Sequence, residues 1–307
     1  MRVCSDGRVS DAIDSPVVES DPAALRAVAV TVASEAAAHV RRRRAELVGA
    51  EGPFGGEADA VQTKSSGTDP VTVADTETED LIRSRLRQLR PGDAFLGEES
   101  GCSDGLGADG VGGTGIQWVV DPIDGTVNFV YGIPAYAVSV AARIDGISVA
   151  GAVVDVASGD LYSAAVGLGA TRTDAEGVVT RLRCTPVADL ALVLVATGFS
   201  YSAERRAVQG RFVAELLPQV RDIRRIGAAA LDLCMVASGR VDAHYEHGLN
   251  PWDWAAGALI ASEAGAEVRL PIGFGDQGEI MTASAPGVAE AFAAALAKIG
   301  ATAPVPA

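Results

Sequence analysis

Residues 118–126 read Trp-Val-Val-Asp-Pro-Ile-Asp-Gly-Thr, and this stretch decides both the fold and the chemistry that we expect. The apolar run 118–120 is typical of a buried strand, and it ends on Asp121. Asp124 follows three residues later, across a turn that Pro122 and Gly125 favour. Residues 124–126 then lead into a predicted helical turn, so two carboxylates lie where a strand passes into a helix.

Further carboxylates occupy comparable positions elsewhere in the chain. Glu98 and Glu99 follow a short predicted strand at 95–96, and Asp253 begins a late predicted helix. Clustered carboxylates repel one another unless a cation lies between them. Mg²⁺ prefers such oxygen ligands, and two ions that share carboxylates can stabilise a displacement at phosphorus. Taken alone, Asp124 is equally well explained as a turn former, because Asp-Gly is a common turn pair.

Bulk properties exclude several classes of partner. The 307 residues carry a net charge of −15, with 40 acidic against 25 basic side chains, which disfavours a nucleic-acid surface. We expect no membrane span, because charges interrupt the apolar N-terminal stretch at 23–40. The four cysteines form no CxxC pair, and the N-terminus has no apolar segment typical of a signal peptide. We therefore expect a cytoplasmic protein with reduced thiols.

The order of the predicted elements indicates a mixed α/β fold of the α+β type. Apolar residues recur at helical spacing from Leu25 to Val40, and we expect this helix to end at the basic run 41–44. Antiparallel strands joined by tight turns, one of them at Asp145-Gly146, are expected from 136 to 173. Strands and helices then alternate, which together predicts two sheets with layered helices. The remaining elements are expected as helices at 75–90, 203–217, 228–238, 253–264 and 286–299, and as strands at 191–195, up to 226, and at 242–246.

We divide the chain into three parts. Residues 1–20 are expected to be a flexible tail, and residues 21–300 a single catalytic domain whose two halves meet near residue 190. Residues 301–307 are expected to be a second tail.

Four motifs, in order along the chain, resemble signatures of the inositol monophosphatase family. They are residues 69–75 (Asp-Pro-Val-Thr-Val-Ala-Asp), 97–100 (Gly-Glu-Glu-Ser), 118–129, and 250–265, which begins Asn-Pro-Trp-Asp-Trp-Ala-Ala-Gly. The resemblance spans roughly Leu25 to Ile299. Residues 245–248 and the Ala/Val/Arg-rich composition look most like the inositol-1-monophosphatases of high-GC bacteria. The resemblance implies a layered αβαβα sandwich, as in other sugar phosphatases.

The resemblance also implies the residues that hold the metals. Glu98, Asp121 and the carbonyl of Ile123 would bind a first Mg²⁺, and Asp121, Asp124 and Asp253 a second. Glu98 would help a weaker third ion, which gives two to three Mg²⁺ per site.

Further implied roles concern the water, the phosphate and the leaving group. A metal-activated water, oriented by Thr126, Asp75 and Glu98, would attack phosphorus. The backbone N–H groups of Gly125 and Thr126 would hold phosphate oxygens. The sugar hydroxyls would face a third set of groups, which consists of Asp124, Glu246 and the main chain at Ala229.

The function implied is hydrolysis of myo-inositol 1-phosphate to inositol and phosphate by a lithium-sensitive homodimer. Ala228 departs from the family pattern, because many relatives carry Thr or Ser there. Two alternatives stay open. One is a phosphatase of the same fold for histidinol phosphate, fructose 1,6-bisphosphate or a 3′-phosphonucleotide. The other is a regulatory protein of the same fold that acts by binding a partner.

Residues 244–247 also invite a zinc site, through His244, Glu246 and His247. Alternation along a strand places His247 on the face opposite to the other two, so three ligands could not converge. We therefore expect no zinc there, and we expect His244 at the surface or in an interface. Cys234 lies on an apolar helix face and is expected in the core.

Overall fold

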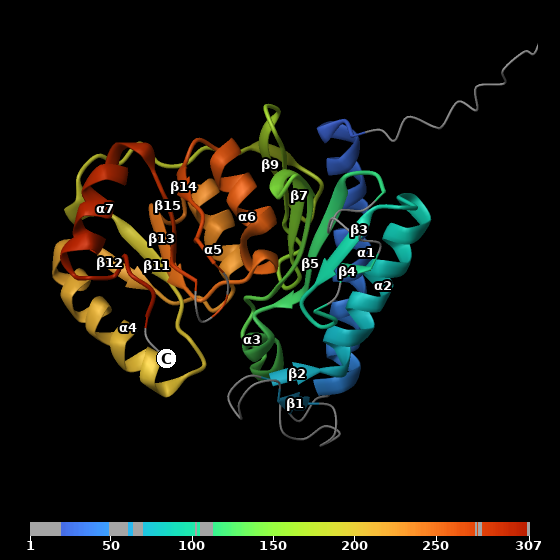
Figure 1. The fold of residues 1–307 in the computed structure, drawn as a ribbon, viewed down its shortest axis with the longest axis horizontal. Coiled ribbons are helices and arrows are strands. Elements are labelled where there is room, and N and C mark those ends of the chain that lie inside the picture. The colour runs from blue at the N-terminus through green and yellow to red at the C-terminus, as the bar shows by residue number, and fades with distance from the viewer. Residues whose placement is uncertain are drawn as a thin grey trace, which may run out of the picture.

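Two sheets and three layers of helices alternate through the molecule, as the sequence and its resemblance predicted (Figure 1). The computed structural model describes residues 20–48, 61–63, 70–101, 103–104, 113–273, 275 and 278–305. Most of the expected tail, residues 1–19, lies outside this set, as do 306–307. From one side to the other, the layers are α1 with α2, the larger sheet, α5 with α6, the smaller sheet, and α4 with α7.

The helices have the following bounds: α1 Pro22–Val48, α2 Val73–Leu89, α3 Thr126–Tyr131, α4 Ala203–Leu216, α5 Ala229–Ala237, α6 Pro251–Glu263 and α7 Ala289–Lys298. The strands are β1 Val61–Thr63, β2 Pro70–Thr72, β3 Ala94–Gly97, β4 Ser103–Asp104, β5 Ile116–Asp124, β6 Ala137–Ile144, β7 Ile147–Asp155, β8 Leu161–Ala165, β9 Gly169–Thr173, β10 Val179–Arg181, β11 Leu194–Thr197, β12 Asp222–Arg224, β13 Ala243–His247, β14 Glu267–Arg269 and β15 Ile280–Ser284. Short 3-10 turns are η1 Leu190–Leu192, η2 Leu217–Gln219 and η4 Pro286–Val288.

The larger sheet has the strand order β10-β9-β8-β7-β6-β5-β3-β4. Its strands pair antiparallel except β3 and β5, which run parallel. The hairpin between β6 and β7 turns at Asp145 and Gly146, whose φ angles are 50° and 76°. Two consecutive positive φ values match the right-handed strand twist, and Asp-Gly tolerates them well. The antiparallel middle of the chain and this turn are thus confirmed.

Helix α1 covers the outer face of this sheet. Its buried stripe is formed by Leu25, Ala29, Val32, Ala36 and Val40, so the predicted spacing is confirmed. By length and composition alone, residues 22–47 would also suit a membrane span, but a core helix with a buried apolar face passes the same test.

The prediction that α1 ends at the basic run 41–44 was wrong, because the helix continues to Val48. The arginines pack onto neighbouring elements instead of capping the helix. Arg41 donates to the Val156 carbonyl at 3.1 Å and Arg44 to the Phe129 carbonyl at 3.2 Å. Arg43 forms an ion pair with Glu77 of α2 at 2.6 Å.

The smaller sheet has the order β12-β11-β13-β15-β14, with β12, β11 and β13 parallel and the other pairs antiparallel. The strand expected at 191–195 was placed too early, because η1 occupies its first part and β11 begins at Leu194. The side chain of Asp189 accepts a hydrogen bond from the N–H of Ala191 at 3.0 Å and so caps a 3-10 turn.

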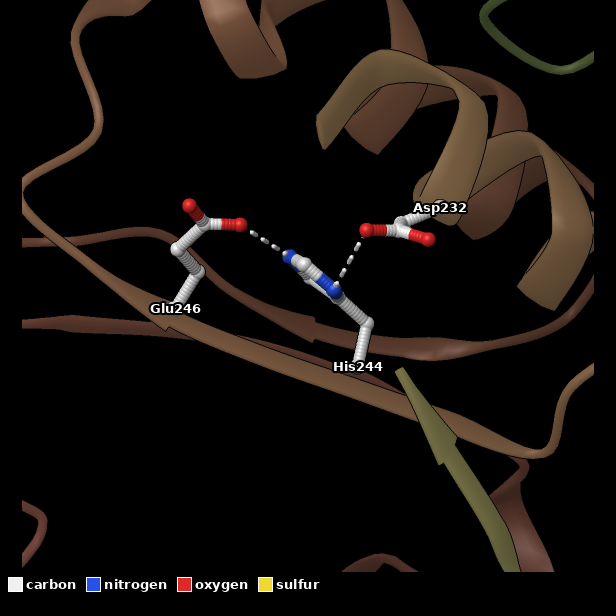
Figure 2. Close-up of side chains that lie close together, drawn as sticks. All are labelled: Asp232, His244 and Glu246. Carbon is white, nitrogen blue, oxygen red and sulfur yellow. Dashed lines mark ion pairs between the residues drawn. The ribbon is translucent and has the colours of Figure 1, made fainter. Parts of the chain in front are cut away.

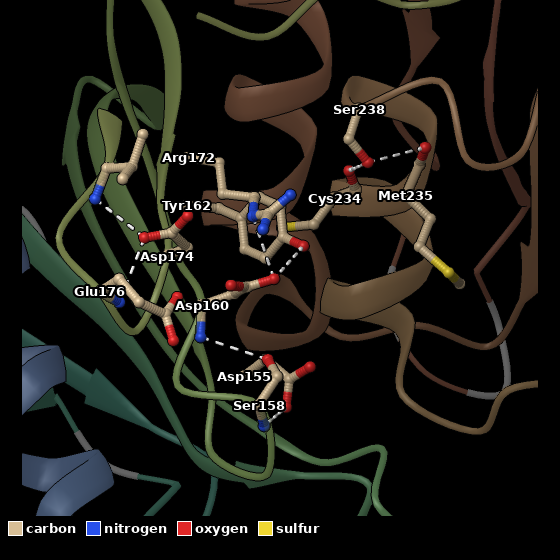
Figure 3. A network of polar contacts seen from close by, with 11 residues as sticks. Asp155, Ser158, Asp160, Tyr162, Arg172, Asp174, Glu176, Cys234, Met235 and Ser238 are labelled. Carbon is tan, nitrogen blue, oxygen red and sulfur yellow. Dashed lines mark hydrogen bonds and ion pairs between the residues drawn. The ribbon is translucent and has the colours of Figure 1, made fainter. Parts of the chain in front are cut away.

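Helices α5 and α6 fill the space between the sheets and belong to the largest apolar cluster. Small residues permit this close packing: a Cβ added at Gly257 would lie 2.9 Å from the Leu233 side chain. Figure 3 shows the contact with the larger sheet, where the Tyr162 ring lies beside Cys234 of α5. Cys234 is 1% exposed, which confirms its place in the core.

The last described residues pack against the second half of the chain, where the sequence analysis expected a tail. Ala301 and Val305 are buried. The Val305 carbonyl accepts a hydrogen bond from Arg205 of α4 at 2.6 Å, and the Ala301 carbonyl lies 2.8 Å from Nε2 of His247. These contacts attach the C-terminal segment to α4 and β13.

Candidate active site

A cavity of about 530 Å³ lies where the ends of β5 and β13 meet the first turns of α3, α5 and α6. Nearly all the site residues expected from the sequence line it, although they come from both halves of the chain. Those that line it are Glu98, Asp121, Ile123, Asp124, Gly125, Thr126, Ala229, Glu246 and Asp253. Asp75 lies outside the lining but contacts Thr126.

A bulge in β5 explains how Asp121 and Asp124 reach the same cavity. Asp121 pairs with Ser139 of β6 and Asp124 with Ala137, so three steps along β5 oppose two along β6. In a regular strand, residues three apart point to opposite faces. The extra residue brings both carboxylates to one face. The N–H of Ile123 donates to the Asp121 carboxylate at 3.0 Å and stabilises this bend.

Glu98 lies in the turn after β3, and Glu79 of α2 holds that turn. The buried Glu79 carboxylate accepts hydrogen bonds from the N–H groups of Glu99 at 2.8 Å and Ser100 at 3.1 Å. Gly97 permits this approach, because a Cβ there would lie 2.3 Å from the Glu79 carboxylate. The turn that presents Glu98 is thus fixed from behind by a second acidic residue, which the sequence analysis did not single out.

Thr126 begins α3 directly after the bulge. Its hydroxyl is within hydrogen-bond distance of the Asp75 carboxylate, at 3.2 Å, and of the Ile123 carbonyl, at 3.1 Å. The residue before it, Gly125, has φ of 90°, and a Cβ there would lie 3.0 Å from the Ala135 carbonyl. Both facts favour glycine. Asp75, Ile123 and Thr126 therefore form one connected unit.

Asp253 and Asp124 are each anchored by a helix N-terminus. Asp253 accepts from the N–H of Asn250 at 2.6 Å, in a capping box at the start of α6. Asp124 accepts from the N–H of Ala230 in the first turn of α5 at 2.7 Å. This contact links the two halves of the chain, because β5 and α5 lie far apart in the sequence. Because Asp124 accepts its hydrogen bond, the N–H of Ala230 is not available to a substrate.

The carboxylates have raised pKa values, chiefly because they are buried. Burial raises the pKa of Asp121 well above its usual value, and nearby Glu98, Asp124 and Asp253 raise it further. Burial likewise raises the pKa of Asp253, with Glu98 and Asp124 adding to the effect. The pKa of Asp124 rises to about 7 through burial, against the lowering effect of its bond to Ala230. The cluster therefore lacks compensating positive charge, which a cation with oxygen ligands would supply.

Glu246, at the end of β13, lies on the other side of the cavity. Burial raises its pKa to about 8, while Arg225 lowers it and Asp124 raises it. Gly198 makes room for this side chain, because a Cβ there would lie 1.9 Å from Oε1 of Glu246. Arg225, which also lines the cavity, is the nearby cation that partly compensates both Asp124 and Glu246.

The prediction that His244 lies at a surface or interface was wrong, because it is 0% exposed. Helices cover both faces of the smaller sheet, so side chains of β13 can be enclosed on either face. His244 lies near Glu246, as period two predicted, and also near Asp232 of α5 (Figure 2). His247 is not part of this group: it stacks on Phe212 at 5.8 Å.

Sequence reasoning missed three residues of this region: Glu79, Arg225 and Asp232. The signal for Arg225 is a basic residue four positions before the start of α5, a helix start that faces acids. Asp232 interrupts an otherwise apolar helix, Ala229–Ala237, and a buried acid of this kind is a candidate partner for another polar group. Glu79 follows Asp75 by one helical turn. Each signal gains meaning only when the tertiary contact is known.

Comparison with known proteins shows which family has this sequence and fold. The model of the inositol monophosphatase family matches residues 21–300. The inositol-1-monophosphatase of Mycobacterium leprae is 58% identical over 292 residues, 94% of this chain and 99% of that protein. The solved structure of Mycobacterium tuberculosis SuhB superposes with a TM-score of 0.77 at 52% identity, covering 92% of this chain and 100% of that one.

A more distant relative carries a different name. The Nus factor SuhB of Escherichia coli is 40% identical over 212 residues, 68% of this chain and 75% of that protein. The family match covers most of the chain, and it includes every residue that lines the cavity. The chain belongs to the inositol monophosphatase family.

Proposed function

We propose that this protein hydrolyses the phosphate monoester of a small polyol, first of all myo-inositol 1-phosphate, to the free polyol and phosphate. The observation that carries the proposal is the convergence on one cavity of a carboxylate cluster and, opposite it, Glu246. The name of the Mycobacterium leprae relative, an inositol-1-monophosphatase at 58% identity, supports the choice of substrate.

Mg²⁺ fits the donor set of the cluster. Metal dependence is general in the family, and the groups available here are oxygens that suit a hard cation. Glu98, Asp121, the Ile123 carbonyl, Asp124 and Asp253 would hold two to three ions. The chemistry that Mg²⁺ supplies when bound is electrophilic stabilisation of phosphoryl oxygens and a lowered pKa of water.

The residues of the chain orient the reactants. Asp75 accepts a hydrogen bond from the Thr126 hydroxyl, which leaves the Thr126 oxygen to accept a hydrogen bond from an attacking water that Glu98 also orients. The N–H groups of Gly125 and Thr126, at the start of α3, hold phosphate oxygens. With Mg²⁺ bound, the lowered pKa of the water would make a strong side-chain base unnecessary.

Glu246 and Asp124 select the leaving group together with the main chain at Ala229. An ionised carboxylate accepts hydrogen bonds from two neighbouring hydroxyls, which suits a polyol. Arg225 favours the ionised form of both Glu246 and Asp124. The small side chains of Ala228 and Ala229 leave space for the ring beside them.

We also infer a lithium-sensitive homodimer in the cytoplasm, with 21–300 as its catalytic domain and neither nucleic acid nor membrane as partner. The family resemblance supports the dimer and the lithium effect, and the net charge of −15 supports the lack of nucleic acid. Light scattering of the purified protein tests the dimer, and inhibition by LiCl against a KCl control tests the lithium effect.

A substrate panel with Mg²⁺ tests the proposed activity. We expect kcat/KM for myo-inositol 1-phosphate to exceed that for histidinol phosphate, fructose 1,6-bisphosphate and a 3′-phosphonucleotide by at least about tenfold. Turnover of any of these three well above that of inositol phosphate would replace the proposed substrate. Absence of all four activities with Mg²⁺ would remove the phosphatase proposal.

A partner-binding role is the second candidate, because relatives near 40% identity are named Nus factors. The carboxylates in the cavity favour catalysis over partner binding. One variant can separate these two roles. Replacing Asp121 with Asn removes hydrolysis in the phosphatase account. If the cellular function of the gene survives that substitution, binding of a partner is the role that matters.

A further inference from the structure

Behind Glu246, three ionisable side chains lie in a row that none of the roles above uses. Figure 2 shows the His244 ring between the carboxylates of Asp232 and Glu246. His244 Nδ1 lies 3.9 Å from an Asp232 oxygen, and His244 Nε2 lies 3.8 Å from a Glu246 oxygen. The row joins α5 to β13 and ends at the wall of the cavity.

The two inner members are fully enclosed and lack partners. Asp232 is 1% exposed and His244 is 0% exposed. Within the described part of the chain, neither Asp232 oxygen nor either His244 nitrogen has a hydrogen-bond partner. A buried polar group without a partner is costly, and four such atoms in one place call for mutual contacts or a ligand.

The orientation of the ring argues against a metal ion as that ligand. The three residues lie close enough to be considered for one, since one ligand atom from each lies within 4.8 Å of the others. However, each ring nitrogen faces a different carboxylate, Nδ1 that of Asp232 and Nε2 that of Glu246. An ion bound to one ring nitrogen would leave the other nitrogen, which faces the second carboxylate, without a partner. The arrangement fits a chain of hydrogen bonds better.

We propose that Asp232 and His244 are positioning residues that hold the Glu246 carboxylate ready for substrate hydroxyls. In this relay, the protonated Asp232 carboxyl donates to His244 Nδ1, and the His244 Nε2–H donates to Glu246. Glu246 thereby keeps its second oxygen and remaining lone pairs for the polyol. The inference deepens the proposed function and rests on the role assigned there to Glu246.

The surroundings supply the protonation states that the relay needs at its two inner members, Asp232 and His244. Burial raises the pKa of Asp232 well above its usual value, with Glu246 and Asp124 adding to the effect, so the acid is the donor. Burial lowers the pKa of His244 to about 3, so the ring is neutral and has one N–H and one acceptor nitrogen. Burial raises the pKa of Glu246, the acceptor at the end of the relay, to about 8, while Arg225 lowers it. A hydrogen bond from the His244 Nε2–H would favour the ionised form of Glu246 further.

The separations are about 1 Å longer than ordinary hydrogen bonds. Contacts in a catalytic site are often long without substrate and tighten when it binds. Gly198 lies close to the Glu246 carboxylate and restricts its movement on that side. A small rotation of Glu246 towards His244 closes the gap and fixes the carboxylate between the ring and Gly198.

The test compares two substrates in four variants. The preference is the ratio of kcat/KM for myo-inositol 1-phosphate to that for p-nitrophenyl phosphate, whose leaving group has no hydroxyls to recognise. We expect His244→Phe to lower this ratio about tenfold, mainly by raising KM for the polyol. His244→Gln and Asp232→Asn each keep a donor and an acceptor in place, so they should stay within about threefold of the wild type. Glu246→Gln serves as the reference for loss of polyol recognition.

The outcomes separate the two proposals. If the wild type shows no preference for the polyol, the proposed substrate fails. If Glu246→Gln removes the preference but His244→Phe keeps it, the relay alone is wrong. Equal losses in His244→Phe and His244→Gln would show that the ring matters only by its packing, and would also overturn the relay.

A spectroscopic measurement keeps the proposal testable should a variant fail to fold. The chain has three histidines, so ¹⁵N-histidine NMR of the wild type can be assigned readily. We expect His244 to carry its proton on Nε2, with an unprotonated Nδ1, and the Nε2 signal to move in Glu246→Gln. A proton on Nδ1 with a bare Nε2, or a signal indifferent to Glu246→Gln, would contradict the relay.

Discussion

The two walls of the cavity are built in different ways. The first wall is mostly local: Asp121, Ile123, Asp124, Gly125 and Thr126 lie within six residues, and one bulge aims them. The second wall is assembled from separate elements, with Glu246 on β13, Arg225 before α5, Asp232 inside α5 and Gly198 after β11.

The walls also differ in how their charge is compensated. On the first wall, neighbouring carboxylates raise one another's pKa values. On the second, the guanidinium of Arg225 lowers the pKa of Glu246 and so partly offsets the effect of burial. A cluster that lacks internal compensation suits an external cation, whereas a compensated one suits recognition of hydroxyl groups. The comparison thus supports the proposals that a cation binds at the first wall and that the second wall selects the substrate.

The largest effect should come from the first wall. Replacing Asp121 with Asn removes a charge that the proposed ions share, and we expect kcat/KM to fall at least about 10³-fold for every phosphate ester. Steady-state kinetics with inositol phosphate and with p-nitrophenyl phosphate measures this. The matched control is Asp145→Asn, the same substitution in the exposed β6–β7 turn. Asp145→Asn should keep wild-type rates, and a similar loss in both variants would contradict the assignment.

Thr126→Val keeps the shape of the side chain but removes the hydroxyl near Asp75 and the Ile123 carbonyl. We expect kcat to fall about 10- to 100-fold with little change in KM, because the hydroxyl orients the attacking water. The expected loss is the same for both phosphate esters. A change confined to the KM for inositol phosphate would indicate that Thr126 binds the substrate. That result would contradict the division of roles between the two walls.

The first wall was largely predictable from the sequence, and the second was not. The strand, turn and helix start at residues 118–126 are contiguous, so local sequence patterns predict their arrangement. The resemblance to the family then implies the role of each residue. Glu246 was found through that resemblance. Its neighbours Asp232 and Arg225 were missed because no local pattern reports which helix packs against which strand. His244 was misplaced for the same reason: alternation gives the face of a strand but not whether that face is covered.

Secondary structure shows the same limit. The periodic helices and the Asp145–Gly146 turn were predicted well. Errors arose where contacts with other elements matter, as at α1, where Arg43 of the basic run pairs with Glu77 of α2 and the helix continues to Val48. Local signals thus predicted the elements, and tertiary contacts decided their ends.

Gly198→Ala tests the second wall without changing a charge. A Cβ at this position would overlap the Glu246 carboxylate, so we expect that side chain to move and KM for inositol phosphate to rise about tenfold. The matched control is Gly210→Ala in α4, where an added Cβ meets nothing within 4 Å. That control should leave KM unchanged and stabilise the fold by about 0.5–1 kcal/mol. An unchanged KM in Gly198→Ala would contradict the role of Glu246.

The smallest expected effect is on stability without metal. The pKa of Asp124, about 7, and that of Glu246, about 8, lie above the unfolded values of 3.8 and 4.5. Both groups therefore stabilise the fold fully only below about pH 4, and this contribution is lost as the pH rises through about 7 and 8.

With EDTA present, we thus expect Tm to fall by a few degrees between about pH 7 and pH 8.5, a range where the histidines are mostly neutral in both states. Saturating Mg²⁺ should raise Tm and remove this decline, because the ions bind the ionised carboxylates. Differential scanning calorimetry at both pH values measures it. A metal-free Tm that rises over this range would contradict the pKa directions on which the comparison rests.

Anomalous diffraction from crystals soaked in Mn²⁺, used in place of Mg²⁺, tests the division between the two walls most directly. We predict anomalous peaks among Glu98, Asp121, Asp124 and Asp253, with Asp121 shared between two ions, and none at Asp232, His244 and Glu246. A peak at His244 with none at Asp121 would contradict both the proposed cation site and the relay.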